Sequence, residues 1–213
     1  MNKRALIART TAGALGGLLL LGAAGAAIAD EMDNDNVDVN VTIEALPPVG
    51  ALTLSVDQAS TTLTEGDSGD ADIRQFDGVL PTVTVTDDRE EVPANTYWYV
   101  TGKTSDFATA GGAKITAGHL GWTPHLLTDA NGEVTEGGPV GTVLDPQDPN
   151  SQAPSNTGIG TGEDLLAIAW DATTAHPQGE WKANADLTLK TPKDVTPGTY
   201  SAKLTLSLWE DQI

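Results

Sequence analysis

The sequence has no cysteine among its 213 residues, so disulfides cannot stabilise it and a thiol cannot serve as a nucleophile. Aromatic residues make up only 5% of it, and 11 Lys and Arg stand against 30 Asp and Glu. A surface of that charge repels nucleic acid, anionic lipid and anionic wall polymers. The composition therefore excludes nucleic acid as a partner and indicates a fold held together by a hydrophobic core.

Signatures of common enzyme classes are missing as well. The chain has no Gly-x-Ser-x-Gly elbow, no His-Glu-x-x-His zinc helix and no phosphate-binding loop. Its three histidines are His119, His125 and His176, and nothing in their spacing requires them to converge on a metal, so we expect them at the surface. We predict that the protein is not an enzyme and has no catalytic residues. A secreted carbohydrate-active enzyme with paired carboxylates stays an alternative, because acidic residues are so abundant.

The first 29 residues have the composition of a cleavable secretory signal peptide. Three basic residues lie within positions 3–9, residues 14–27 are apolar, and residues 27–29 (Ala-Ile-Ala) offer a cleavage site. Cleavage removes three of the 11 basic residues and none of the 30 acidic ones, so the net charge falls from −19 to −22. We predict a mature protein that begins near Asp30 and acts outside the cytoplasm.

No membrane anchor is expected in the mature chain. The C-terminal residues 209–213 (Trp-Glu-Asp-Gln-Ile) form neither an apolar span nor a sorting tail, and a lipid-bearing cysteine is absent. Any retention at the cell surface would then depend on non-covalent contacts of the folded domain. The abundance of Ala, Gly, Thr and Asp suggests a bacterial source.

The N-terminal part of the mature chain changes from an acidic leader to alternating strands. Residues 30–36 are polar and acidic, whereas apolar residues alternate with polar ones over 37–43 and again over 52–56, which is typical of half-buried strands. The segment 65–72 between strands is acidic and glycine-containing, and we interpret it as a loop. Its carboxylates make one weak set of calcium candidates: Asp67, Asp70 and Asp72.

The remaining chain also has the pattern of a β protein. Strands are predicted over 79–86, 96–101, 114–117, 165–170, 187–190 and 200–208. The strand at 165–170 is apolar on both faces and is expected in the centre of a sheet, and the last strand is expected to form a hairpin with 187–190. Residues 129–163 predict one long loop. About eight strands and no amphipathic helix predict an all-β antiparallel sandwich, immunoglobulin-like or jelly-roll-like, over 37–213.

The last predicted strand carries a recognisable motif. Tyr200, Leu204, Thr205 and Leu208 match the pattern Tyr-x-x-x-aliphatic-Thr-Trp-x-Leu, with Leu206 at the tryptophan position. With the upstream segment described next, this resembles the WxL domain, a cell-wall-binding module of Gram-positive bacteria. The resemblance implies a β-sandwich that associates with peptidoglycan or another wall glycan without catalysis, and it implies other surface proteins as further partners.

The upstream segment of the resemblance lies at 80–88 (Leu-Pro-Thr-Val-Thr-Val-Thr-Asp-Asp), followed by Trp98 and Val100. Val100 occupies the place of the family's leucine. Because residues two apart on a strand share a face, Trp98 and Val100 are predicted on one face. By the same rule Leu206 lies with Leu204 and Leu208, whereas Trp209 lies on the opposite face.

Aromatic residues are the candidates for contact with a wall glycan or a partner. Single aromatics on a strand face pack in the core more often than they bind ligands, so we favour core packing for Trp98 and Tyr200. Trp122 and Trp181 have turn-like neighbours and are better candidates for exposed stacking platforms, and Trp209 completes the set. The preferred hypothesis is a cell-wall-associated surface protein. The alternative is a structural or adhesive subunit that binds partner proteins through strand edges or the long loop.

Overall fold

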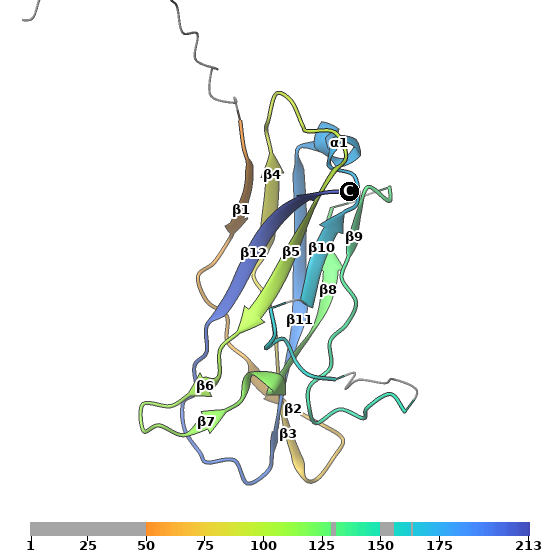
Figure 1. The fold of residues 1–213 in the computed structure, drawn as a ribbon. Helices are drawn as coiled ribbons and strands as arrows, with labels where there is room; N and C mark the ends of the chain where they lie inside the picture. Colours follow the sequence, from red (N-terminus) through yellow and green to blue (C-terminus); the bar gives the residue numbers. More distant parts are fainter. Residues whose placement is uncertain (1–49, 129–130, 150–155, 163) are drawn as a thin grey trace, which may run out of the picture. The chain divides into compact units, whose positions relative to one another are not determined.

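The computed structural model describes residues 50–128, 131–149, 156–162 and 164–213. The predicted signal peptide, the acidic leader and the strand at 37–43 lie outside these residues. Within them, antiparallel strands form two main sheets, which pack face to face as an all-β sandwich (Figure 1). The predicted fold class is therefore confirmed.

One sheet is built around the longest strand. It contains β1 (Leu52–Val56), β2 (Thr64–Gly66), β3 (Ile73–Val79), β4 (Val83–Asp87), β8 (Leu120–Leu126) and β11 (Glu180–Pro192). Ala183 of β11 pairs with Val83 of β4 on one side and with Leu126 of β8 on the other. Since β3 and β8 both pair with the stretch around Leu187, β3 must lie on the same side of β11 as β4. We call this the β11 sheet.

The other main sheet has the order β12-β5-β10-β9. Its strands are β5 (Thr96–Thr104), β9 (Val134–Glu136), β10 (Asp164–Ala169) and β12 (Leu204–Gln212). The prediction that 165–170 forms a central strand is confirmed, because β10 lies between β5 and β9. We call this the β5 sheet. A small separate hairpin consists of β6 (Phe107–Ala108) and β7 (Lys114–Ile115), and the helical turns are η1 (Ala117–His119), α1 (Ala172–Ala175) and η2 (His176–Gln178).

Two predictions about strand partners and limits are wrong. The last strand does not form a hairpin with 187–190, because β12 pairs with β5 and β11 belongs to the other sheet. The predicted strand at 79–86 is interrupted, since β3 ends at Val79 and β4 begins at Val83. Pro81 lies in the interruption and has no N–H for a ladder hydrogen bond. The break is local, because the Leu80 N–H still donates to the Ala185 carbonyl of β11 at 2.8 Å.

The long loop predicted at 129–163 is also only partly irregular. It contains β9, which pairs with β10, and it buries Ile159 completely. The Ile159 N–H donates to the Leu120 carbonyl at 2.9 Å, and its carbonyl accepts from the Thr104 N–H at 2.8 Å. Turn-forming residues dominate this stretch, so its composition conceals the few positions at which it joins the two sheets.

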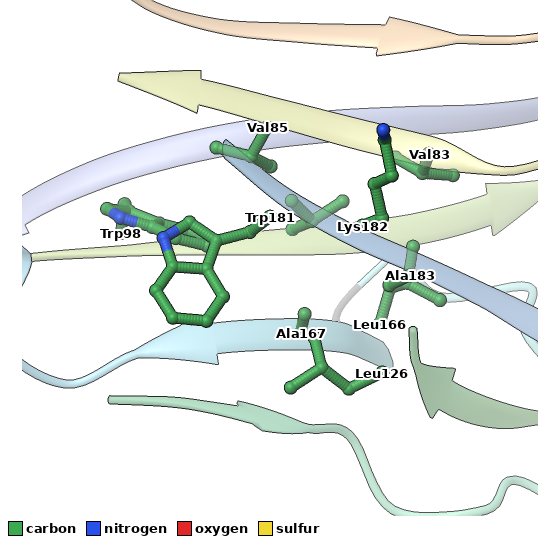
Figure 2. A pocket seen from close by; sticks show the side chains of 10 residues that line it. Val83, Val85, Trp98, Leu126, Leu166, Ala167, Trp181, Lys182 and Ala183 are labelled. Carbon is green, nitrogen blue, oxygen red and sulfur yellow. The ribbon is translucent and has the colours of Figure 1, made fainter. Parts of the chain in front are cut away.

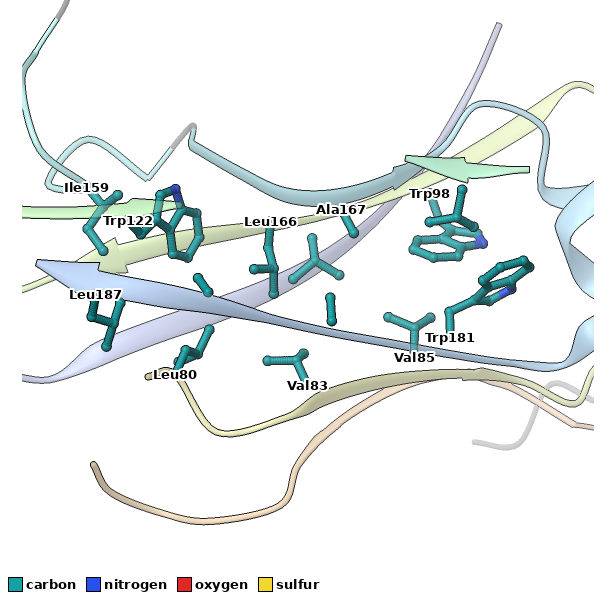
Figure 3. Close-up of a cluster of buried hydrophobic side chains, with 14 of the residues drawn as sticks. Leu80, Val83, Val85, Trp98, Trp122, Ile159, Leu166, Ala167, Trp181 and Leu187 are labelled. Atoms are coloured by element: carbon teal, nitrogen blue, oxygen red, sulfur yellow. The ribbon is translucent and has the colours of Figure 1, made fainter. Parts of the chain in front are cut away.

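The interior between the sheets is filled by apolar side chains (Figure 3). Trp122 extends from the β11 sheet to the β5 sheet, where Gly102 makes room for it: a Cβ at Gly102 would lie 2.4 Å from the indole. Near Trp98 and Trp181 a cavity of about 10 Å³ remains (Figure 2), which is about the space of one water. The interior therefore has no room for a ligand there.

Candidate functional site

The structure separates the tryptophans into buried and exposed groups. Trp98, Trp122 and Trp181 are 1%, 2% and 3% exposed, so they are core residues. The prediction for Trp98 is confirmed, whereas Trp122 and Trp181 are not exposed platforms. Trp122 lies in β8, which continues through Pro124, and Trp181 lies in β11, which begins at Glu180 directly after the turn residue Gly179. The side chains of Trp122 and Trp181 point into the core because of the register in which their strands pair, and the local sequence does not reveal that register.

The motif positions of the resemblance lie along two paired strands. Val100 is buried on the same face as Trp98, and β12 places Leu208 opposite Val100. Leu206 lies opposite Gly102 and packs against the core, as the alternation predicts. The other inward motif leucine is Leu204, and Thr205 is exposed between them.

Tyr200 is half-buried and precedes β12 rather than belonging to it. Its ring packs against the core, and its hydroxyl donates to the Thr196 carbonyl at 2.8 Å. This is the arrangement of a packed tyrosine with a satisfied polar end. Tyr200 is therefore a structural residue in its present contacts, as favoured from the sequence.

An aromatic row lies on the outer face of the β5 sheet and consists of Tyr97, Tyr99 and Trp209. The rings of Tyr97 and Tyr99 have centroids 5.8 Å apart and planes at 16°, and those of Tyr99 and Trp209 are 6.4 Å apart at 20°. The register explains the contact, since Trp209 is directly opposite Tyr99. Trp209 is 50% exposed, and its Nε1 donates to the Thr101 hydroxyl at 3.0 Å.

The aromatic row offers apolar ring surface together with polar edges. Burial, the charge of Asp211 and the neighbouring Tyr99 raise the pKa of the Tyr97 hydroxyl above its ordinary value, so it stays protonated at neutral pH. A protonated phenol can both donate and accept a hydrogen bond. Parallel rings with such edges suit a ligand that has apolar C–H surface and hydroxyl groups.

A polar cleft lies on the outward face of the other sheet. Its floor comes from β3, β8 and β11, and its wall is the segment 139–145; it has a volume of about 250 Å³. The lining side chains include Gln75, Thr123, Thr188 and Lys190. The cleft and the aromatic row thus belong to different sheets.

The segment 139–145 is held against the β11 sheet at two points. The Trp122 and Val140 backbones exchange two hydrogen bonds of 2.9 Å, and Lys190 Nζ donates to Asp145 Oδ1 at 2.5 Å. Asp145 Oδ2 also accepts from the Thr142 N–H at 2.7 Å and from its hydroxyl at 2.9 Å. Burial raises the pKa of Asp145, but Lys190 and Thr142 outweigh it, so the pKa lies below the ordinary value.

A buried ion cluster joins the two sheets at one end of the sandwich. Arg89 donates to both oxygens of Asp87 at 2.7 Å and, from its third nitrogen, to Glu210 of β12 at 2.7 Å. Asp87 is 3% exposed, and His176 Nδ1 lies 3.5 Å from it. Burial raises the pKa of Asp87, but the hydrogen bonds and charge of Arg89 outweigh it, and the pKa lies below 3.8. These partners make the cluster a structural connection.

The three calcium candidates do not form a common site. Asp67 accepts from the Gly69 N–H at 2.9 Å, Asp70 accepts from the Asp72 N–H at 2.8 Å, and Asp72 pairs with Lys193. Among the described residues, no group of three or more His, Asp or Glu is placed to hold a metal ion. The carboxylates instead shape the turn between β2 and β3.

The histidines likewise lie apart from one another. His119 bonds to the Thr116 hydroxyl at 2.9 Å, whereas His125 pairs with Asp186 at 3.0 Å on the outer face of the β11 sheet. His176 is in the ion cluster and is 29% exposed, so it is less accessible than a surface position would be. His125 and His176 thus lie beside different aspartates, Asp186 and Asp87 respectively.

Sequence reasoning found Trp209 but missed its two partners in the aromatic row. Tyr97 and Tyr99 alternate with Trp98 and Val100, so the assignment of one pair to the core was already a signal for an outward pair. The sequence also did not associate Asp145 with Lys190, which are 45 positions apart.

No protein-family model matches the sequence, and a search of curated proteins finds no significant match either. Solved structures that are similar in part include the following two. A chain from a study of the chaperone–tip adhesin complex in CFA/I fimbriae biogenesis is 10% identical, with a TM-score of 0.39 over 74% of this chain and 41% of that chain. A family 123 glycoside hydrolase from Clostridium perfringens is 13% identical, with a TM-score of 0.29 over 63% of this chain and 18% of that chain. The matches span less than half of either neighbour, and likenesses at these scores carry no argument about function.

Among the residues that the structure describes, helices are short, and none has the length and hydropathy required for a membrane crossing.

Proposed function

We propose that this protein is a non-catalytic, secreted surface protein that associates non-covalently with cell-wall peptidoglycan through its WxL-like β-sandwich. The observation that carries the proposal is the aromatic row, in which Tyr97, Tyr99 and Trp209 stack on an outward sheet face. The predicted signal peptide supports export, and the motif around Leu204 and Leu208 supports the resemblance to a wall-binding module.

The physical basis for glycan contact is stacking combined with hydrogen bonds. A sugar ring has apolar C–H faces that pack on aromatic rings and hydroxyls that pair with polar groups beside them. Trp209 contributes the largest ring, and half of its surface is exposed. With 8 basic and 30 acidic residues after removal of the predicted signal peptide, the net charge is −22, so attraction to anionic wall polymers does not drive this association. Binding should therefore persist when salt is raised, unlike binding driven by charge.

The test is co-sedimentation of the purified protein with peptidoglycan from Gram-positive cells, with and without calcium. We expect sedimentation in both conditions, and we expect Trp209→Ala to reduce the bound fraction strongly. Trp170→Ala is the matched control, because Trp170 is 61% exposed and stands outside the aromatic row. Absence of sedimentation with the wild-type protein in both conditions would refute direct wall binding.

The two other hypotheses, a structural or adhesive subunit and a carbohydrate-active enzyme, predict different experimental results. Crosslinking on intact cells that yields protein adducts resistant to wall digestion would favour a structural or adhesive subunit. Release of soluble sugars from wall preparations would favour a carbohydrate-active enzyme. Equal loss of sedimentation in Trp170→Ala and Trp209→Ala would show that the aromatic row is not the specific contact.

A further inference from the structure

The polar cleft of the β11 sheet has the geometry of a binding site that is separate from the aromatic row. Its wall approaches the sheet closely, because Gly121 lies under the Val140 carbonyl, where a Cβ would come within 2.5 Å. Leu187 and Leu189 point into the core, so Thr188 and Lys190 of the same strand point outward to the floor. The cleft is therefore formed by regular strands and by the segment 139–145, which hydrogen bonds hold against the sheet.

The polar groups on the floor are held in position by neighbours. Gln75 Nε2 donates to both oxygens of Asp77 at 3.0 Å, and the Thr188 hydroxyl donates to Asp77 Oδ1 at 3.0 Å. These contacts use the Thr188 hydroxyl hydrogen and one of the two N–H groups of Gln75. The second Gln75 N–H is left as a donor, and the Gln75 carbonyl oxygen and the Thr188 lone pairs are left as acceptors. The Lys190 ammonium has three N–H donors, of which Asp145 takes one.

The charge of the lining favours a neutral ligand. Lys190 and Asp145 are already paired with each other, and their side chains are only 20% and 23% exposed. A charged ligand would have to compete with this partly buried pair, whereas hydroxyl groups can use its remaining donors and lone pairs. Asp77 beside the floor adds negative charge that repels an anion.

The volume of the cleft and the apolar part of its wall further restrict the class of ligand that it can bind. Sites for drug-sized molecules usually enclose about 300–1,000 Å³, and this cleft, at about 250 Å³, lies just below that range. Pro139 and Val140 make part of the wall apolar, opposite the polar floor. A single sugar ring has this combination of an apolar face and a hydroxyl-bearing edge.

We propose that the cleft between the floor residues Gln75, Thr188 and Lys190 and the wall 139–145 binds one uncharged pyranose ring. This site is independent of the aromatic row, so it can exist whether or not the protein associates with peptidoglycan.

The experiment is an NMR titration of the ¹⁵N-labelled full chain with methyl β-D-glucopyranoside, methyl β-D-galactopyranoside and N-acetylglucosamine, each compared with glucuronic acid. We expect saturable shifts of the backbone amides around Gln75, Thr188 and Thr142 with at least one neutral sugar, and weaker shifts with the acid. Shifts confined to Tyr99 and Trp209 would place the sugar on the aromatic row and overturn the proposal. No saturable shift, or tighter binding of glucuronic acid, would overturn it as well.

Two variants and a control separate binding from folding. Thr123→Tyr fills the cleft from an exposed position and should abolish the shifts, and Thr188→Val should weaken binding about three- to tenfold through the loss of one hydrogen-bonding group. Thr86→Val is the control, since Thr86 lies on the same outward sheet face away from the cleft. Unchanged affinity in a folded Thr188→Val, together with unchanged affinity in a folded Thr123→Tyr, would contradict the assignment.

Discussion

The two faces of β5 carry aromatic residues in the same stretch of chain but use them differently. On the inner face Trp98 is 1% exposed and packs in the core, and on the outer face Tyr99 stacks between Tyr97 and Trp209. Residue type does not distinguish the faces, because both are aromatic and β-forming. The distinction comes from the β11 sheet, which covers one face only. A ring that is covered stabilises the fold, whereas a ring left outside is available to a ligand.

Separate replacements of the inward Trp98 and the outward Tyr99 should give the largest difference in stability between the two faces. Trp98→Ala should lower the free energy of unfolding by about 3–5 kcal/mol, because it opens a cavity in a packed core. Tyr99→Ala should lower it by no more than about 1.5 kcal/mol, since that ring is half-buried and loses mainly stacking contacts. Urea unfolding followed by fluorescence measures both. Equal losses in the two variants would break the comparison between the faces.

The ion cluster tests how the two sheets are held together. Asp87→Ala leaves the Arg89 guanidinium, 12% exposed, with only Glu210 as its partner. Loss of one member of a buried pair costs about 3–5 kcal/mol, and we expect the lower end because one partner remains. The exposed pair of Arg74 and Glu65 is the control, and Glu65→Ala should leave the urea midpoint nearly unchanged.

Acid should weaken the same cluster. The pKa of Asp87 is lower in the folded protein than its ordinary value of 3.8, so its ionised form contributes stability above that pH. That contribution is lost as the pH falls from 3.8 through the folded pKa. Thermal unfolding measured down this range should show a falling midpoint, with a shallower fall in Asp87→Asn. Identical slopes in the two proteins would assign the acid sensitivity to other carboxylates.

The smallest effect concerns the aromatic row itself. In a double-mutant cycle, Tyr99→Ala and Trp209→Ala should show a coupling energy of about 0.5–1.5 kcal/mol, which is typical of aromatic pairs in contact. Equilibrium unfolding of the two single variants and the double variant provides it. A coupling near zero would mean that the rings lie beside each other without stabilising the sheet.

Strand periodicity predicted much of the fold but little of the arrangement of its strands. It placed Trp98 and Val100 on one face, and the structure buries both. It missed β8 and most of β11, because Pro124 and the glycines around Trp122 and Trp181 are also turn formers. Pairing along the full length of β8 and β11 outweighs the local preference of these residues for a turn.

Both candidate sites depended on contacts between distant residues. Trp209 was predicted as an outward candidate, but its stacking on Tyr99 needs β12 to pair with β5 rather than with β11. The polar cleft needs Asp145 to reach Lys190, which no local pattern encodes. The calcium candidates Asp67, Asp70 and Asp72 show the converse, since closeness in sequence did not bring their carboxylates to one point.

Composition and periodicity were enough to predict the β class, the need for a disulfide-free core and which side chains of a strand share a face. The reason is that charge, cysteine content and a period of two are properties of the chain alone. The tertiary structure decided which face was covered, so it made core residues of Trp122 and Trp181 and left Trp209 exposed. Alternation defines two faces, but only the packing of a second sheet determines which of them is removed from water.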